Sequence, residues 1–225
     1  MNFRLVDLSA EEIAQQLSVV EPLTDSVRGL IDAVIRTEVD DDELNAAREQ
    51  IDAIVARLRT KQKPGSFGVQ FTRELSGLSW GNAAVGARNG IAPPMRIVHH
   101  EDGRATCDVE LGAAYEGPGG LVHGGVSAML IDQLLGEAAS VGNGLPCFTG
   151  TLTVKYLRPT PLGPLSMSAE TVRREGRKIF VRGEICTADG PTVTAEAIMV
   201  SPKELPSRDQ IMKLRAELAA QDGQG

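Results

Sequence analysis

The chain has 225 residues, 42 % of them hydrophobic, which suits one sizeable domain or one domain with a helical extension. Its net charge of −7 and isoelectric point near 5.1 argue against a broad basic surface for nucleic acid or an anionic membrane. No apolar run reaches membrane-spanning length, and the first residues lack the pattern of a signal peptide. We therefore expect a soluble, cytoplasmic protein that binds neither nucleic acid nor membrane.

Residues 1–62 are predicted to form a helical extension. Ser9 and Glu12 fit a capping box, and the acids of residues 40–43 suit the positive end of a second helix. An apolar stripe at helical spacing follows, formed by Leu44, Ala47, Ile51, Ile54 and Leu58. Acids outnumber bases over residues 1–63, and there is no basic recognition helix. We therefore expect a packing or oligomerisation arm rather than a DNA-binding module.

Residues 63–202 are predicted to form the main domain. Short strands and turns are expected up to residue 105, including Pro93-Pro94, which is unsuited to a central strand. A mostly apolar helix is expected over 124–141, and strands over 105–111, 149–157, 165–173, 178–187 and 192–200. One long helix followed by an antiparallel meander is an α+β pattern in which the sheet covers the helix. The C-terminal segment, 203–225, is predicted to contain an amphipathic helix over 207–220.

The three cysteines are Cys107, Cys147 and Cys186. They are odd in number, well separated and set among strand-like residues, without the spacing of metal ligands. We expect reduced thiols of a cytosolic protein and no metal site.

Glycine-rich residues 119–125 lead directly into the predicted helix, which carries one acid, Asp132, near its middle. On a helical wheel, the neighbours of Asp132 are the small residues Ala128, Gly136 and Ala139, which leave room for a molecule beside the carboxylate. The alternative is an acid that only bonds to a nearby backbone amide, since buried carboxylates usually have structural partners.

His123 and Gly124 stand at the start of the same helix. A glycine there allows close backbone approach, and its amide points outward at the positive end of the helix dipole. Such an amide can hold an oxygen that develops negative charge, as in acyl transfer. His-Gly-Gly is weak evidence by itself, and its value lies in the combination with the apolar helix and the acid.

The distance between Gly124 and Asp132 points to an oligomer. Eight residues of helix separate them by roughly 12 Å. An oxyanion donor and an attacking acid must both lie within about 3 Å of one carbonyl group. Two such helices, antiparallel across a two-fold axis, can supply both groups, so we expect at least a dimer, and a monomer should be inert.

The sequence resembles the hotdog-fold acyl-CoA thioesterases, in particular the PaaI-like branch marked by His-Gly-Gly. The resemblance covers roughly residues 66–200. It rests on Val122–Gly125, Asp132, the strand from Phe148 to Pro159, the hairpin at residues 173–178 and the segment 89–94.

The resemblance implies a long helix wrapped by a curved antiparallel sheet, in a homodimer or tetramer with sites at the protomer interface. The Gly124 amide would polarise the thioester carbonyl, and Asp132 of the other protomer would act as nucleophile or as base on water. His123 would support the loop before the helix, and Thr149 would position water or the acid. No cofactor is implied beyond the substrate's own CoA.

The chain departs from the family at one site position. Many relatives carry Asn or Gln six residues before the histidine, where this chain has Gly117. CoA contacts are expected from Gly125 and from Arg158, Arg177 and Lys178, which lie at strand ends or in a hairpin where they could meet phosphates. The alternative for these basic residues is simple solvation.

The leading hypothesis is hydrolysis of an acyl-CoA thioester. A second is a non-catalytic hotdog module that binds acyl-CoA and regulates a partner through the helical extension. A third is a hotdog hydratase or dehydratase, which would need a His–acid pair. We rank it last because the chain has only three histidines and the threonine at position 149 fits the thioesterase pattern better.

Overall fold

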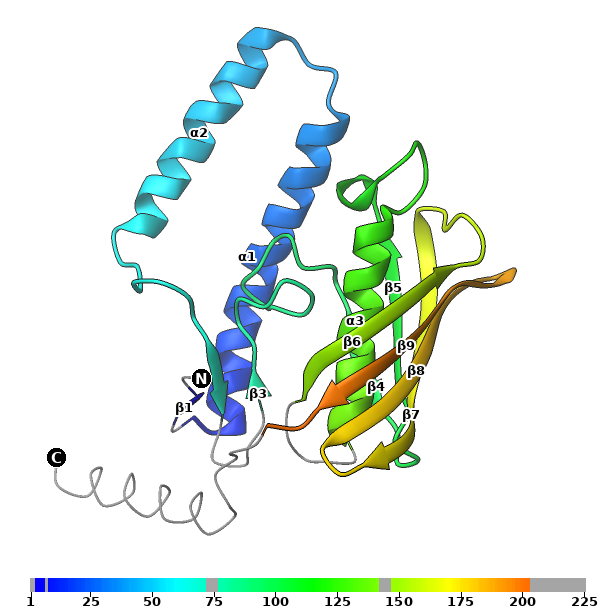
Figure 1. The fold of residues 1–225 in the computed structure, drawn as a ribbon. Coiled ribbons are helices and arrows are strands. Elements are labelled where there is room, and N and C mark those ends of the chain that lie inside the picture. Colours follow the sequence, from blue (N-terminus) through cyan, green and yellow to red (C-terminus); the bar gives the residue numbers. More distant parts are fainter. Residues whose placement is uncertain (1–2, 7, 72–76, 142–146, 203–225) are drawn as a thin grey trace, which may run out of the picture. The chain divides into compact units, whose positions relative to one another are not determined.

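The computed structural model describes residues 3–6, 8–71, 77–141 and 147–202 (Figure 1). The elements in chain order are β1 (Phe3–Leu5), α1 (Ala10–Arg36), α2 (Asp41–Arg59), β2 (Val69–Phe71), β3 (Gly77–Leu78), β4 (Arg96–His99), β5 (Ala105–Leu111), the 3-10 helix η1 (Ala113–Tyr115), α3 (Gly124–Val141), β6 (Phe148–Tyr156), β7 (Gly163–Glu175), β8 (Lys178–Thr187) and β9 (Gly190–Val200). The helix predicted over 207–220 lies outside the described residues. Two compact units result: Met1–Pro93 with Gly112–Ala114, and Pro94–Leu111 with Tyr115–Gly225.

The first unit contains the two helices predicted for the extension. Ser9 Oγ accepts a hydrogen bond from the Glu12 amide at 3.2 Å, and the Glu12 carboxylate accepts one from the Ser9 amide at 2.7 Å. This is the predicted capping box. Asp40 caps α2 by accepting from the Glu43 amide at 3.0 Å. The prediction of helix is wrong for Phe3–Leu5, which pair in parallel with β2, a partner too distant in sequence for a local pattern to reveal.

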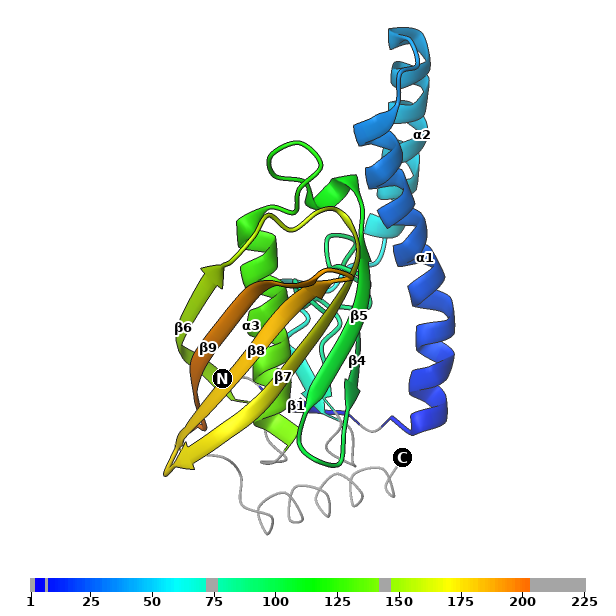
Figure 2. The same cartoon turned by 90° about the vertical axis from the view of Figure 1, so that its right-hand side faces the viewer.

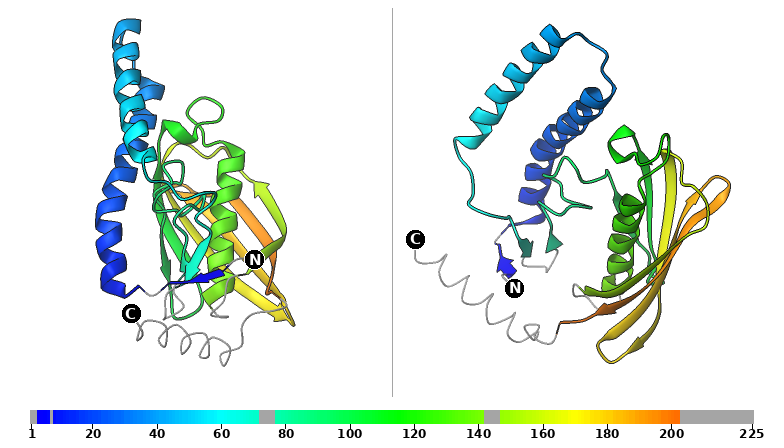
Figure 3. Two further views of the ribbon diagram at one scale, coloured as in Figure 1. Left: turned by 90° about the vertical axis from the view of Figure 1, so that its left-hand side faces the viewer. Right: turned by 45° about the horizontal axis from the view of Figure 1, so that its top comes forward.

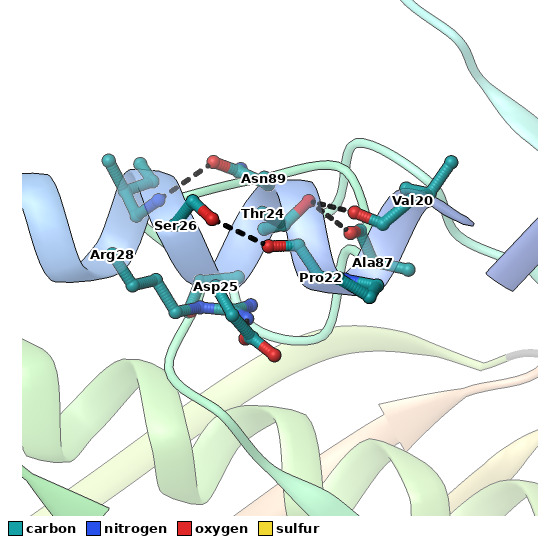
Figure 4. Close-up of polar contacts among 10 residues, drawn as sticks. Val20, Pro22, Thr24, Asp25, Ser26, Arg28, Ala87 and Asn89 are labelled. Carbon is teal, nitrogen blue, oxygen red and sulfur yellow. Dashed lines mark hydrogen bonds and ion pairs between the residues drawn. The ribbon is translucent and has the colours of Figure 1, made fainter. Parts of the chain in front are cut away.

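The loop of residues 79–93 packs along α1 (Figure 4). The Thr24 hydroxyl lies 2.7 Å from the Ala87 carbonyl oxygen, and Arg28 Nε donates to the Ala92 carbonyl at 3.0 Å. Gly90 approaches the helix so closely that an added Cβ would lie 2.6 Å from Val27 Cγ1. The loop and the helix therefore belong to one unit, which extends to Pro93.

The second unit is a six-stranded antiparallel sheet with α3 along one face (Figures 1 and 3). Its strand order is β4-β5-β7-β8-β9-β6, and the sheet curves around the helix (Figure 2). The α+β hotdog arrangement predicted from the sequence is confirmed.

The core of this unit lies between α3 and the inner face of the sheet. Every second residue of β5 is buried, as expected for a strand with one covered face. The helix contributes Leu130, Ile131, Leu134 and Leu135, all fully buried, and each such side chain stabilises the fold by about 1.5–3 kcal/mol relative to exposure. At Gly183 the strand passes so close to its neighbours that an added Cβ would lie 2.7 Å from the Ser168 carbonyl oxygen.

Strand β6 is an edge of this sheet, and a bulge decides how it faces α3. Thr149 is opposite Met199 and Thr151 is opposite Ile198, so Gly150 is the extra residue. Opposed residues share a face, and Met199 is fully buried, so the bulge turns Thr149 toward the helix. The strand ends with Tyr156 on the same face.

The three cysteines, all within the described ranges, form no disulfide. Burial raises the pKa of the Cys107 and Cys186 thiols above the ordinary value. None of the helices in the described ranges is long and apolar enough to cross a membrane.

Candidate active site

The start of α3 is held by its own loop. The His123 amide donates to the Tyr115 carbonyl at 2.9 Å, and the His123 carbonyl accepts from the Val126 and Ser127 amides at 2.9 and 3.1 Å. The Gly125 amide donates to His123 Nδ1 at 3.0 Å. Since Nδ1 accepts this bond, the ring proton of the neutral imidazole is on Nε2. His123 therefore fixes the first turn of the helix through both its backbone and its ring.

The Gly124 amide is left available by this arrangement. It belongs to the first turn, where amides have no acceptor within the helix, and no acceptor for it is present in the described part of the chain. The Gly124 carbonyl accepts from the Tyr156 hydroxyl at 2.8 Å. A Cβ at this glycine would lie 3.5 Å from the Tyr156 ring, an ordinary contact. Tyr156 thus ties the first residue of α3 to strand β6 through the Gly124 carbonyl.

The loop before the helix leaves no room for a side chain at Gly117. A Cβ there would lie 2.8 Å from His123 Cα, so no side chain fits without moving the backbone. The Gly117 amide donates to the Leu121 carbonyl at 2.8 Å. The neighbouring Glu116 carboxylate accepts from the Gly120 amide at 2.6 Å and closes the same loop. The Asn or Gln side chain that the resemblance would place at this position therefore has no room in this loop.

Asp132 and Thr149 meet between α3 and β6. Thr149 Oγ1 donates to Asp132 Oδ1 at 2.9 Å. The bulge at Gly150 makes this contact possible, because regular alternation would place Thr149 on the face of Thr151 and Thr153. The hydroxyl fixes one carboxylate oxygen and leaves the other without a partner among the described residues.

The residues of α3 next to Asp132 have small side chains, and other parts of the chain cover them only in part. Ala128 is partly exposed, and a Cβ added at Gly136 would meet no described atom beyond its own helix within 4 Å. Ala139, the third small neighbour predicted from the helical wheel, is buried in the core. The open part of this surface leaves space beside the carboxylate for a ligand or a second protein chain.

A second polar group lies on the next flank of α3. Gln133 Nε2 donates to the Glu137 carboxylate at 2.8 Å, and His99 Nε2 on β4 lies 3.1 Å from the same carboxylate. The chain therefore contains a His–acid pair, although it does not involve the histidine of the glycine-rich segment. Its geometry attaches the edge strand β4 to the helix.

The basic residues considered for CoA lie at opposite ends of the sheet. Arg177 precedes β8 and donates to the Ser201 carbonyl at 2.9 Å, and Lys178 beside it is exposed. Arg158 donates to the Asp189 carbonyl at 3.1 Å, just beyond the other end of β8. A ten-residue strand spans about 30 Å, so one protomer does not bring Arg158 and Arg177 together.

Sequence reasoning missed the contribution of Tyr156. In the sequence Tyr156 is one residue of the strand that carries the resemblance, whereas in the structure its hydroxyl donates to the Gly124 carbonyl. A polar aromatic residue at the end of a strand was the available signal. Its partner could not be inferred, because the contact depends on how β6 crosses α3.

The comparisons with known proteins agree with this fold. The sequence pattern of the thioesterase superfamily matches residues 119–194. The crystal structure of a thioesterase superfamily protein is 33 % identical, with a TM-score of 0.73, and the match covers 81 % of this chain and 91 % of that one. This chain belongs to the thioesterase superfamily.

Two curated relatives match over part of their length. The acyl-coenzyme A thioesterase THEM4 of Xenopus laevis is 36 % identical over 104 residues, which are 46 % of this chain and 46 % of the relative. The THEM4 enzyme of Bos taurus is 30 % identical over 100 residues, 44 % of this chain and 40 % of the relative. The matched region thus spans less than half of either enzyme.

Proposed function

We propose that this protein hydrolyses acyl-CoA thioesters to a free acid and CoA. The observation that carries the proposal is the Gly124 amide, which has no acceptor among the described residues and stands at the start of a helix that also carries a hydrogen-bonded carboxylate. Membership of the thioesterase superfamily and the partial match to two acyl-CoA thioesterases support the same chemistry.

The Gly124 amide is proposed to bind the thioester oxygen. Attack on the carbonyl carbon gives that oxygen negative charge, which a backbone amide at the positive end of a helix stabilises. His123 supports this role because its ring Nδ1 accepts the hydrogen bond of the Gly125 amide. This bond fixes the first turn of α3 and leaves the Gly124 amide available to the substrate. Gly125 is proposed to lie beside the bound CoA, and a Cβ there would lie 3.2 Å from His123 Nδ1, so a larger residue would disturb the imidazole ring.

Asp132 is proposed as the attacking group or the base. As nucleophile, its carboxylate would displace CoA thiolate and form a mixed anhydride, which water then cleaves to the acid. As general base, it would take a proton from water while the oxygen of that water attacks the thioester. Thr149 supports either route by holding one carboxylate oxygen, so that the other can face the substrate.

We propose that each site is shared between two protomers. The two groups lie eight residues apart on one helix, roughly 12 Å along its axis, which is too far for one carbonyl group. The partly uncovered surface around Ala128 and Gly136 supports packing of a second chain beside Asp132. A two-fold axis would bring Gly124 of one protomer to Asp132 of the other.

The CoA phosphates are proposed to bind Arg177 and Lys178 of one protomer. Arg158 of that protomer lies at the other end of β8 and cannot bind the same phosphates. Arg177 keeps part of its guanidinium free while Nε bonds to Ser201. Arg158 already gives its Nε and one terminal nitrogen to carbonyls of the β8–β9 turn, so it has less to offer a phosphate.

A thiol-release screen over short, long and aromatic acyl-CoA esters tests the activity. We expect release of CoA by the parent chain and a loss of at least about a hundredfold in kcat for Asp132→Asn, with the oligomer intact. Retention of near-parent turnover by Asp132→Asn would refute the assigned role. Binding of acyl-CoA without thiol release across the panel would favour the regulatory alternative over the enzyme.

A further inference from the structure

The helix α2 has an apolar stripe that the described residues of the chain leave uncovered. None of its nineteen residues is buried, and Leu44, Ile54 and Leu58 are 43–55 % exposed. A helix in water gains most of its stability from covering such a stripe rather than from its intrinsic propensity. The stripe therefore indicates a missing partner for α2.

The preceding helix does not fill this role within the same chain. Helix α1 buries Val20 and Thr24 and uses this side against the loop of residues 79–93. Its other apolar residues, Val19, Leu23 and Val34, are 49–65 % exposed. Both helices of the first unit thus keep apolar side chains in water.

The spacing of the α2 stripe is that of a coiled-coil seam. Leu44, Ala47, Ile51, Ile54 and Leu58 follow one another at alternating steps of three and four residues. This is the heptad repeat, with Leu44, Ile51 and Leu58 at one core position and Ala47 and Ile54 at the other. Such a seam accepts another helix of the same spacing.

The charges of α2 select an antiparallel copy of itself. In α2, residues 41–52 hold five acids and one base, whereas residues 53–59 hold two bases and no acid, and Lys61 and Lys63 follow just after the helix. This polarity suits the dipole of the helix itself. It also makes two antiparallel copies complementary along their whole length, while two parallel copies would align acids with acids and bases with bases.

We propose that α2 pairs antiparallel with α2 of a second copy of this chain. The register that best fits the seam opposes Ile51 to Ile54 of the other copy and Ala47 to Leu58, so that a small residue faces a large one. In this register Glu43 lies beside Arg57 of the other copy at the rim, and the two Val55 side chains meet on the opposite rim. The inference is independent of the thioesterase activity.

Cross-linking of single-cysteine variants of the full chain tests both pairing and direction. In the proposed register the two copies of residue 50 lie about 8 Å apart along the axis, and the two copies of residue 42 about 30 Å apart. With a short bis-maleimide, Gln50→Cys should give several-fold more covalent dimer than the parent chain, whose own cysteines set the baseline. Asp42→Cys should stay at that baseline.

Two further variants complete the test. Glu49→Cys, one residue away on the outer face of the seam, is the matched control and should remain near the baseline. Adding Ile54→Glu to Gln50→Cys should abolish the cross-link while circular dichroism shows an intact fold. Equal cross-linking at residues 42 and 50 would overturn the antiparallel direction. Baseline cross-linking at residue 50 would overturn the pairing itself and favour closure of α2 on α1 within one chain.

Discussion

Two side chains on strand β6 are placed to control the groups that the reaction would use. Thr149 fixes a carboxylate oxygen of Asp132, and Tyr156 fixes the residue that carries the candidate oxyanion donor. Both face α3, and both are held by a strand rather than a loop. We therefore expect that a shift of a few tenths of an ångström at either end of β6 would lower the rate of the proposed reaction more than it lowers the stability of the fold.

Tyr156→Phe is expected to lower kcat with little change in KM. The substitution keeps the aromatic ring and removes only the hydroxyl that donates to the Gly124 carbonyl. A neutral hydrogen bond contributes about 0.5–1.5 kcal/mol, so a loss of up to roughly tenfold in kcat is expected. Steady-state kinetics on one good acyl-CoA ester measure the effect. An unchanged kcat would show that the hydroxyl does not position Gly124.

Thr149→Val is expected to lower kcat by about tenfold or more, because the substitution keeps the shape of the residue and removes the donor to Asp132. Thr153→Val is the matched control, since it changes an exposed threonine on the outer face of the same strand. Equal rates for the two variants would contradict a role for the Thr149 hydroxyl.

The residues of this candidate site can be selected from the sequence, and their roles stay predictions. The acid at position 132 stands out because its wheel neighbours are small, and His123-Gly124 stands out at the start of an apolar helix. The Thr149 contact was predicted by resemblance, but its cause was hidden. The bulge at Gly150 depends on pairing with β9, about fifty residues further along the chain, which a local pattern cannot encode.

At the scale of elements, β8 and α3 each contain a glycine whose environment the sequence cannot distinguish from that of the other. Gly183 of β8 faces the core beside Ile131 of the helix, and a Cβ would lie 2.7 Å from a backbone oxygen. Gly136 of α3 borders open space. The first glycine permits the sheet to approach the helix, whereas the second leaves a gap next to Asp132.

The pair Gly183→Ala and Gly136→Ala tests this difference by urea unfolding. Gly183→Ala should lower the free energy of unfolding by about 1–3 kcal/mol, because the backbone cannot give way easily. Gly136→Ala should cost much less than Gly183→Ala, since alanine favours the helix interior and its Cβ meets no described atom of its own chain beyond the helix. A stable Gly183→Ala variant would show that β8 does not constrain the core as described.

Strand β1 shows the limit of periodicity at this scale. Its three residues were included in a predicted helical segment, and they form a strand only because β2 offers a parallel partner. The helices α1 and α2, by contrast, can be predicted from their capping residues and the spacing of their apolar residues, since these signals lie within a few residues of one another. Signals between neighbouring residues thus predict helices, whereas the pairing of a strand with a partner far along the chain is not visible in the residues of that strand.

For the whole molecule, the central question is whether each site draws on two chains. A chain with Gly124→Pro lacks the amide donor, yet proline is well tolerated at the first residue of a helix. Gly124→Ala is its matched control, because it keeps the amide and adds a Cβ at an ordinary 3.5 Å from Tyr156. Gly124→Pro should lose at least about a hundredfold in kcat, and Gly124→Ala much less.

Hybrid dimers then test the sharing directly. A Gly124→Pro chain and an Asp132→Asn chain, co-expressed with different tags and purified through both, form dimers with one chain of each kind. If sites are shared, one site of each hybrid combines the two defects and the other has neither, so about half of the parent activity per dimer should return. If each site lies within one chain, both sites keep one defect and the hybrid should be as inactive as either variant alone. Thiol release by the purified hybrid, compared with both homodimers, therefore separates a two-chain site from a one-chain site, because no contact within a single helix can bring these two groups to one carbonyl.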